Sequence, residues 1–223
     1  MSAAPTAAPT MDVLDHLLEE AKAAHGHLCA GQVLGVRLAM YGCGCLGIED
    51  PRGADRKRLV TFVEIDRCAT DAIGVVTGCR LGKRALKFRD WGKMAATFVD
   101  LKTNRAIRIS ARESSKEAAR RLHPEIEDKN RQQMAAYREM TDQELFDAQW
   151  VRVDLAAREF PGYRGERIAC SQCGEGISYD RFLVRDGQTL CISCAAPQER
   201  YYQPLEPQRL EPAAVPRPRF EHP

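Results

Sequence analysis

The residues of this sequence most able to do chemistry are cysteines and histidines, and they gather in two places. Two CxxC motifs separated by 17 residues lie in the last quarter of the chain, and an HxHxC motif, within AHGHLCAGQVLG, lies near its start. Thiolate sulfurs and imidazole nitrogens are the usual protein ligands of zinc and of several other transition metals. Both places are therefore candidate metal sites.

The paired CxxC motifs predict a zinc ribbon. Each CxxC turn directs two sulfurs at one ion, and four thiolates complete a tetrahedron around Zn²⁺. The spacer contains Arg185-Asp186-Gly187, which predicts a hairpin turn between two apolar pieces. A redox dithiol, the competing interpretation, needs one exposed CxxC at a helix start rather than two matched pairs. The predicted zinc ligands are Cys170, Cys173, Cys191 and Cys194.

The role of this ribbon follows from its size and charge. A core this small needs a metal to fold, which favours a structural role. Residues 161–223 carry eight arginines, no lysine and eight acidic residues, so their net charge is zero. This balance weighs against binding to phosphates, and we expect a structural role or a protein contact.

In the HxHxC motif, His25, His27 and Cys29 alternate just before a predicted helix. In an extended segment such residues share a face, and the positive end of a helix lowers the pKa of a nearby thiol. Three donors could bind a metal, or a Cys–His pair could do nucleophilic chemistry. The structural alternative is that His25 caps a helix end and His27 makes one internal hydrogen bond.

Four more cysteines precede the ribbon. Cys68 follows a strand end at a helix start, where α/β-type folds place ligands and nucleophiles, and Cys79 follows the next helix. Buried cysteine is also a common small core residue, so packing is the alternative for both. Cys43 and Cys45 lie in a glycine-rich stretch and are either soft-metal ligands or loop packing.

The elements that position these residues are predicted from periodicity and end signals. We expect helices over residues 10–26, 29–41, 69–79 and 113–140, with a capping box at 141–144 opening one more. We expect strands over residues 58–66, 94–100, 105–111 and 150–155. The domains expected are a disordered tail (1–10), a metal-binding α+β domain (11–160), the ribbon (165–197) and a proline-rich tail (198–223).

Composition narrows the class of protein. A net charge of +2 gives no electrostatic reason to expect a nucleic acid or an anionic membrane as partner. The first residues lack the basic cluster and apolar core of a signal peptide, and the most apolar run, 33–48, is interrupted by Arg37. That run is shorter than the ~20 apolar residues of a membrane span. The nine cysteines, an odd number, favour reduced thiols, so we expect a soluble, cytoplasmic protein.

The stretches HGHLCAGQVLGVR and VEIDRCATDAIGVVTGCRLGKRALKFRDWGKMAATFVD resemble the formylmethanofuran dehydrogenase FmdE family. The likeness covers residues 14–155, and the ribbon is similar to a C-terminal zinc finger of many members. It implies an α+β fold with a mixed sheet, similar to the catalytic domain of glyceraldehyde-3-phosphate dehydrogenase, and a homodimer. It also implies a metal-binding protein tied to molybdenum or tungsten enzymes of formate-level carbon.

Carried over residue by residue, the family motif falls on His25, His27, Cys29, Gly31, Gly35, Cys68, Asp71, Gly78, Cys79, Gly82, Lys83 and Trp91-Gly92-Lys93. The resemblance implies a second site, for zinc, iron, nickel or an iron–sulfur cluster, at His25, His27, Cys29 and Cys68. Cys79 and Asp71 are its catalytic candidates, and Lys83 and Lys93 its cofactor-binding candidates.

Four functions fit these residues. We favour an accessory protein or subunit of a molybdopterin or tungstopterin enzyme. The alternatives are an enzyme with an open metal position, using Cys79 or Asp71, and a regulator that places its ribbon on DNA or RNA polymerase. An iron–sulfur protein is the fourth, although the chain lacks the dense CxxCxxC run of ferredoxins. Whether the chain is itself an enzyme stays open.

Overall fold

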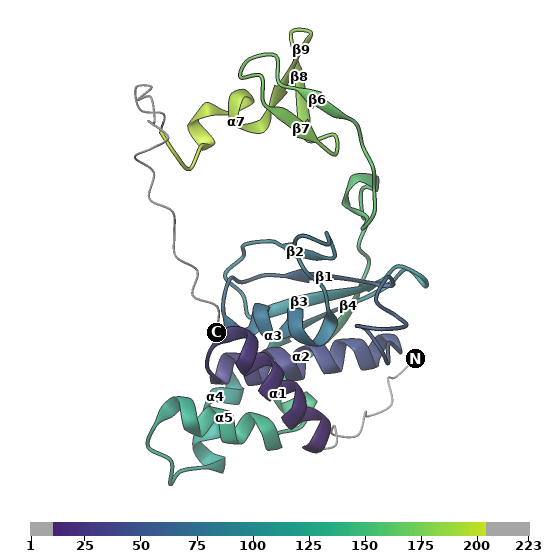
Figure 1. Ribbon diagram of the computed structural model, residues 1–223. Helices are drawn as coiled ribbons and strands as arrows, with labels where there is room; N and C mark the ends of the chain where they lie inside the picture. Colours follow the sequence, from purple (N-terminus) through teal and green to yellow (C-terminus); the bar gives the residue numbers. More distant parts are fainter. Residues whose placement is uncertain (1–10, 204–223) are drawn as a thin grey trace, which may run out of the picture. The chain divides into compact units, whose positions relative to one another are not determined.

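A computed structural model describes residues 11–203 of the chain (Figure 1). The predicted N-terminal tail and most of the proline-rich tail lie outside these residues. The chain divides into two compact units, the first ending at Tyr163 and the second beginning at Arg164. Among the described helices, none combines the length and the apolar character needed to cross a bilayer.

The first unit is built on a five-stranded mixed sheet with the strand order β2-β1-β3-β4-β5. The strands are β1 (Leu59–Val63), β2 (Leu86–Phe88), β3 (Ala95–Asp100), β4 (Arg105–Ala111) and β5 (Phe146–Val151). β1 and β2 are parallel and the other neighbours are antiparallel. Since parallel neighbours need a crossover, helix α3 (Cys68–Thr77) lies between them in the chain. The predicted α+β class with a mixed sheet is confirmed.

Helices cover one face of this sheet. α1 (Met11–His25), α2 (Ala30–Leu46) and α3 lie together on that face (Figure 1). α4 (Ser114–Leu122) packs on α5 (Lys129–Glu139), α5 packs on α2, and the short α6 (Asp142–Leu145) leads into β5. Along β1, Leu59 and Val63 join the large core, whereas Val60 joins a smaller cluster. This alternation buries both faces of β1, which explains its continuous apolar sequence.

Two predicted helices differ from the structure. The helix expected over 113–140 is divided into α4 and α5, because Pro124 has no N–H and restricts the residue before it. Asp128 then caps α5 by accepting a hydrogen bond from the Arg131 N–H (2.8 Å). The helix expected over 29–41 continues to Leu46, so Cys43 and Cys45 are helical rather than in a loop.

Two strands also differ from the prediction. The strand expected over 150–155 begins four residues earlier, as β5 (Phe146–Val151). It begins earlier because α6 is only four residues long and ends directly before Phe146. The capping box itself is present at Thr141 and Glu144. β2 was not predicted, since three residues are too few for an alternating pattern to stand out.

Helices α2 and α3 cross closely because α2 carries glycines at the contact. A Cβ atom at Gly35 would lie 2.5 Å from the carbonyl oxygen of Ala69 and 2.9 Å from the Cβ of Ala72. No side chain fits at these distances, so the two backbones touch. On the sheet side, a Cβ at Gly42 would lie 2.4 Å from the Phe98 ring of β3.

The Gly35→Ala variant tests this crossing. The added methyl overlaps the Ala69 backbone, and we expect a loss of about 1–3 kcal/mol in the free energy of unfolding, measured with urea. Gly44 is the matched control, since it lies on the same helix with nothing within 4 Å of its would-be Cβ. Gly44→Ala should be neutral or gain up to about 1 kcal/mol. Equal stability of the two variants would contradict the close crossing.

Arg37 is the largest fully buried side chain of the described residues, with 1% exposed. Its guanidinium donates hydrogen bonds to the carbonyl oxygens of Tyr137 (2.8 Å) and Met140 (2.9 Å), and to the carboxylate of Asp142 (2.8 Å). The last carbonyls of α5, which have no partner within their own helix, are thereby satisfied. Arg37, the charged residue that interrupts the apolar run of α2, thus attaches α5 and α6 to α2.

The Arg37→Met variant leaves the Asp142 carboxylate buried without its partner. We expect a loss of about 3–5 kcal/mol in the free energy of unfolding by urea. The control is Arg138→Met, which removes a more exposed ion pair between Arg138 and Asp15 (2.9 Å). Such a pair contributes about 1 kcal/mol or less. The account of Arg37 is wrong if the two variants lose similar stability.

Candidate metal sites

The second unit brings four cysteine sulfurs within 4.8 Å of one another. Its strands are β6 (Arg167–Ala169), β7 (Gly176–Ser178), β8 (Phe182–Arg185) and β9 (Gln188–Cys191), paired as two hairpins, followed by α7 (Ile192–Ala195) and the 3₁₀ turn η2 (Pro197–Glu199). Within the described ranges, these four cysteines are the single set of three or more His, Cys, Asp or Glu ligand atoms gathered this tightly.

Local turns place the four sulfurs. Cys170 and Cys173 lie in the turn between β6 and β7, where Gly174 adopts φ +76° and donates its N–H to the Cys170 carbonyl (3.0 Å). Asp186 and Gly187 both have positive φ, 49° and 74°, as a tight hairpin turn requires. This turn returns the chain to Cys191 at the end of β9, and Cys194 follows in α7.

The surroundings favour the thiolate at two of these sulfurs, Cys170 and Cys191, whereas the pKa of Cys173 is raised and the neighbouring Cys191 thiol raises the pKa of Cys194 to about 12. Backbone N–H groups of Cys173 and Cys191 point at the Cys170 sulfur and lower the pKa of its thiol to about 6. The Ser193 hydroxyl, 3.2 Å from the Cys191 sulfur, lowers the pKa of that thiol. Thiolates are the form that binds metal, and four of them suit tetrahedral Zn²⁺.

The core of the second unit is small. Its buried members are Cys170, Ile177, Leu190, Cys194 and Ala195. Two of the five are zinc ligands, so the metal replaces much of the apolar core that a larger domain would have.

Removing one ligand should unfold this unit alone. We expect Cys173→Ser to lose the ribbon zinc and to make residues after Arg164 sensitive to protease, while the first unit keeps its unfolding transition. Gln172→Ala is the control, because Gln172 is exposed between the same two cysteines. Zinc per chain and limited proteolysis are the measurements. Protease resistance of the zinc-free variant would show that the metal is dispensable for this fold.

The HxHxC residues of the first unit lie where α1 ends and where α2 and α3 begin. Gly26, with φ +96°, follows His25 at the end of α1, Cys29 is the N-cap of α2, and Cys68 opens α3. A Cβ at Gly31 would lie 3.5 Å from the Cβ of Cys68 and 3.7 Å from the sulfur of Cys29. The two cysteines are therefore neighbours. Burial, and then the adjacent Cys29 thiol, raise the pKa of Cys68.

Two histidines accompany these cysteines. The Nδ1 atom of His25 lies 2.8 Å from a carboxylate oxygen of Asp71, in the first turn of α3. The ring of His27 lies 4.7 Å from that of His25, centroid to centroid. A carboxylate on one imidazole nitrogen orients the other nitrogen, as second-layer carboxylates do in metal sites. This geometry makes Asp71 a positioning residue for His25.

Two polar residues at this site were missed from the sequence. The side-chain oxygen of Asn130 in α5 accepts the Ala30 N–H (2.9 Å), so Asn130 caps α2 and the Cys29 thiol does not. Gln32 is fully buried, and its amide has no hydrogen-bond partner among residues 11–203. Asn130 is 100 residues from Ala30 in sequence, and no local pattern marks either role.

The other cysteines of the first unit lie elsewhere. Cys79 is buried beyond the opposite end of α3, where its sulfur lies 3.5 Å from the Thr61 hydroxyl, and burial raises its pKa. Burial also raises the pKa of Cys43 to about 12, with Cys79 as its neighbour. Cys43 is about 20 Å along α2 from Cys29, at 1.5 Å per residue. One iron–sulfur cluster joining Cys29 and Cys68 with Cys79 and either Cys43 or Cys45 is therefore excluded.

The two predicted cofactor-binding lysines lie on separate segments. Lys93 belongs to the loop after β2, which docks on β1 because the N–H groups of Trp91 and Lys93 donate to the Glu64 carbonyl (3.2 and 3.1 Å). Glu64 precedes Cys68 by four residues, so this loop lies at the edge where α3 begins. Lys83 instead lines a cavity near the opposite end of α3.

Comparisons with known proteins find relatives of both units. Residues 24–147 match the family described as FmdE, molybdenum formylmethanofuran dehydrogenase operon. Residues 162–200 match the prokaryotic DksA/TraR C4-type zinc finger.

One curated relative and one solved structure extend these matches. A probable S-adenosyl-L-methionine-binding protein of Archaeoglobus fulgidus is 32% identical over 206 residues, covering 82% of this chain and 53% of that protein. The chain thus spans about half the length of this relative. A tungsten formylmethanofuran dehydrogenase FmdE-like protein from Syntrophus aciditrophicus matches with a TM-score of 0.58 and 16% identity, covering 87% of this chain and all of that one. At this identity the likeness shows the fold alone.

Proposed function

The chain belongs to the FmdE family, and from that premise we propose that it binds two metal ions for different purposes. The ribbon holds a structural zinc. The second ion, zinc, iron or nickel, binds at His25, His27, Cys29 and Cys68. The observation that carries this proposal is the meeting of Cys29 and Cys68 at the starts of two helices.

The donor set of the second site supports a transition metal. Two thiolates and two imidazoles are ligands of zinc and of softer divalent ions. Asp71 holds His25 through Nδ1 and leaves Nε2 free to bind the ion. The ligand atoms do not yet lie within 4.8 Å of one another, so binding requires the imidazole rings to turn toward the sulfurs. The exposed position of His27 allows such a turn.

A site closed by four protein ligands leaves no position for substrate, which favours a non-catalytic role. We propose an accessory protein, acting as a homodimer, for a molybdenum or tungsten enzyme of the formylmethanofuran dehydrogenase type. The family is described by a molybdenum formylmethanofuran dehydrogenase operon, and the Syntrophus protein is described as similar to a subunit of the tungsten enzyme; both support this association. The second candidate is a metalloenzyme. It is favoured by the His25–Asp71 pair, which could act as an acid–base pair beside an ion held by three ligands.

Metal counting tests the second site. We expect two metal ions per chain in protein purified anaerobically with a thiol reductant, and one in Cys29→Ser or Cys68→Ser. Cys45→Ser is the control, since Cys45 lies at the far end of α2, and it should keep both ions. Protein with cobalt in place of the native metal should show sulfur-to-cobalt charge-transfer absorption. In Cys29→Ser this absorption should weaken but not disappear, because the ribbon cysteines still bind cobalt.

The same variants test the accessory role. In an affinity pull-down with the tagged chain as bait, we expect the wild type and Cys45→Ser to retain a molybdenum or tungsten enzyme. Cys29→Ser should retain less of that enzyme. A single zinc that is insensitive to Cys29→Ser and Cys68→Ser would overturn the second site. If the purified protein is brown and contains acid-labile sulfide, the second site holds an iron–sulfur cluster rather than a single ion.

A further inference from the structure

A cavity of about 930 Å³ lies in the first unit, near the end of α3 opposite to Cys68. The C-terminal half of α1, the loop between α2 and β1, the end of α3 and the turn before β2 all contribute to it. Its apolar lining includes Leu59, Val75 and Ala85, and Pro51 and Pro161 also line it. The proposed metal sites do not use this cavity.

The charged lining of this cavity is strongly positive. Its cationic residues are Arg52, Arg56, Lys57, Arg80 and Lys83. The acidic residue that lines it, Glu20, is paired with Arg52. Arg56 donates to the Gly53 carbonyl (3.1 Å). For the other three cations, no described residue supplies an ion pair or a hydrogen bond to the side chain. The cavity therefore faces three positive charges that the described protein leaves uncompensated.

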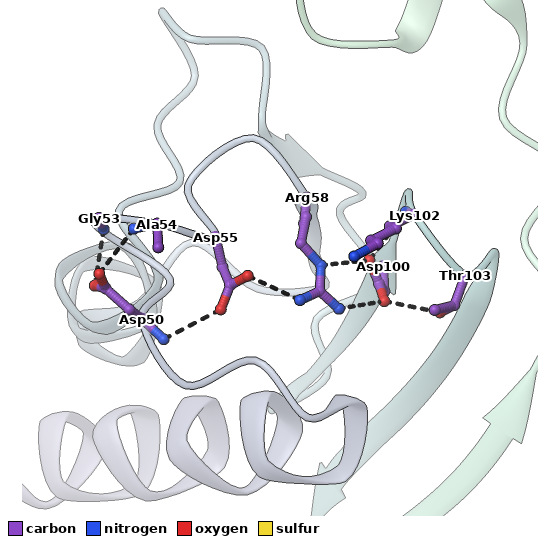
Figure 2. A network of polar contacts seen from close by, with 8 residues as sticks. All are labelled: Asp50, Gly53, Ala54, Asp55, Arg58, Asp100, Lys102 and Thr103. Atoms are coloured by element: carbon purple, nitrogen blue, oxygen red, sulfur yellow. Dashed lines mark hydrogen bonds and ion pairs between the residues drawn. The ribbon is translucent and has the colours of Figure 1, made fainter.

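A polar network holds the loop that carries several of these cations (Figure 2). The Asp50 carboxylate accepts the N–H groups of Gly53 (2.9 Å) and Ala54 (2.7 Å), which closes the loop on itself. Arg58 then bridges the carboxylates of Asp55 and Asp100 (2.8 Å each) and so attaches the loop to the end of β3.

The anchor of this network is Asp100, which is fully buried. Its carboxylate accepts hydrogen bonds from the Lys102 N–H (3.0 Å) and the Thr103 hydroxyl (2.7 Å), besides those of Arg58 (Figure 2). Arg52, Arg56 and Lys57 are thus presented by a loop that is already in place. A ligand that binds there loses little entropy to ordering of the protein.

We propose that this cavity binds a nucleoside diphosphate or a closely similar ring-bearing organic diphosphate. The volume falls within the roughly 300–1,000 Å³ of small-molecule sites. The apolar lining suits a planar ring, and the uncompensated Lys57, Arg80 and Lys83 suit the charges of a diphosphate. The C-terminal end of α3 carries a partial negative charge, so the ring lies against Gly74 and the phosphates lie toward the lysines.

Calorimetric titration of the full chain with ADP and GDP tests this assignment. We expect at least one of them to bind, and the Kd to rise about tenfold or more in Lys57→Gln and in Lys83→Gln, since each loses a charge-assisted contact. Binding should weaken as salt rises. The matched control is Lys116→Gln on α4, whose lysine is paired with Glu113 and does not line the cavity. This variant should bind like the wild type.

Three further probes separate the ring from the phosphates. Pyrophosphate and adenosine should each bind more weakly than the diphosphate that carries both parts. S-adenosyl-L-methionine, an adenosine derivative with a sulfonium cation in place of phosphates, should bind more weakly still. The proposal is overturned if neither ADP nor GDP binds at millimolar concentration, if the Lys57→Gln/Lys83→Gln double variant binds as the wild type does, or if pyrophosphate or S-adenosyl-L-methionine binds as tightly as the diphosphates. Metal content, measured in parallel, should be the same in all variants.

Discussion

The contact between α2 and α3 at Gly35 determines where the chemistry of the first unit lies. With no side chain at Gly35, the α3 backbone approaches that of α2 at Ala69, and the starts of both helices meet. Cys29 and Cys68 become neighbours at that end, and the positive ends of two helix dipoles point to the same place. At its other end, α3 delivers Gly74 and Gly78 to the cavity. The start of α3 therefore lies at the partly buried pair Cys29 and Cys68, and its end lies at the cationic cavity.

The two groups of cysteines depend on the fold in different ways. In the ribbon, the ligands form a large part of a five-residue core, so metal binding and folding depend on each other. In the first unit, the large core is complete without Cys29 and Cys68, which lie at its margin and are only partly buried. An ion could enter or leave the proposed second site without unfolding the domain. That property suits handling of a metal better than permanent storage of one.

How far the sequence could predict this molecule depends on how local each signal is. The ribbon was predictable because four cysteines and one turn specify it within 25 residues. The neighbouring Cys29 and Cys68 could only be suspected, since their meeting depends on a glycine whose partner is 34 residues away. Arg37 interrupted an apolar run and could not be assigned a buried partner, because Asp142 lies on a distant helix. The cavity could not be predicted from the sequence for a similar reason. Its cationic residues are spread over residues 52–83, and each one alone has the pattern of a solvent-exposed charge.

Helix α5 is held to α2 at two points. Near the start of α5, the side chain of Asn130 accepts a hydrogen bond from the first N–H of α2, beside Cys29. At the end of α5, the carbonyl oxygens of Tyr137 and Met140 accept hydrogen bonds from the Arg37 guanidinium. The second attachment is deeply buried, and the first lies next to the cysteines that meet at the helix starts. The Ala30–Asn130 hydrogen bond therefore couples the turn that holds Cys29 to the start of α5, while the buried contacts of Arg37 fix the end of that helix.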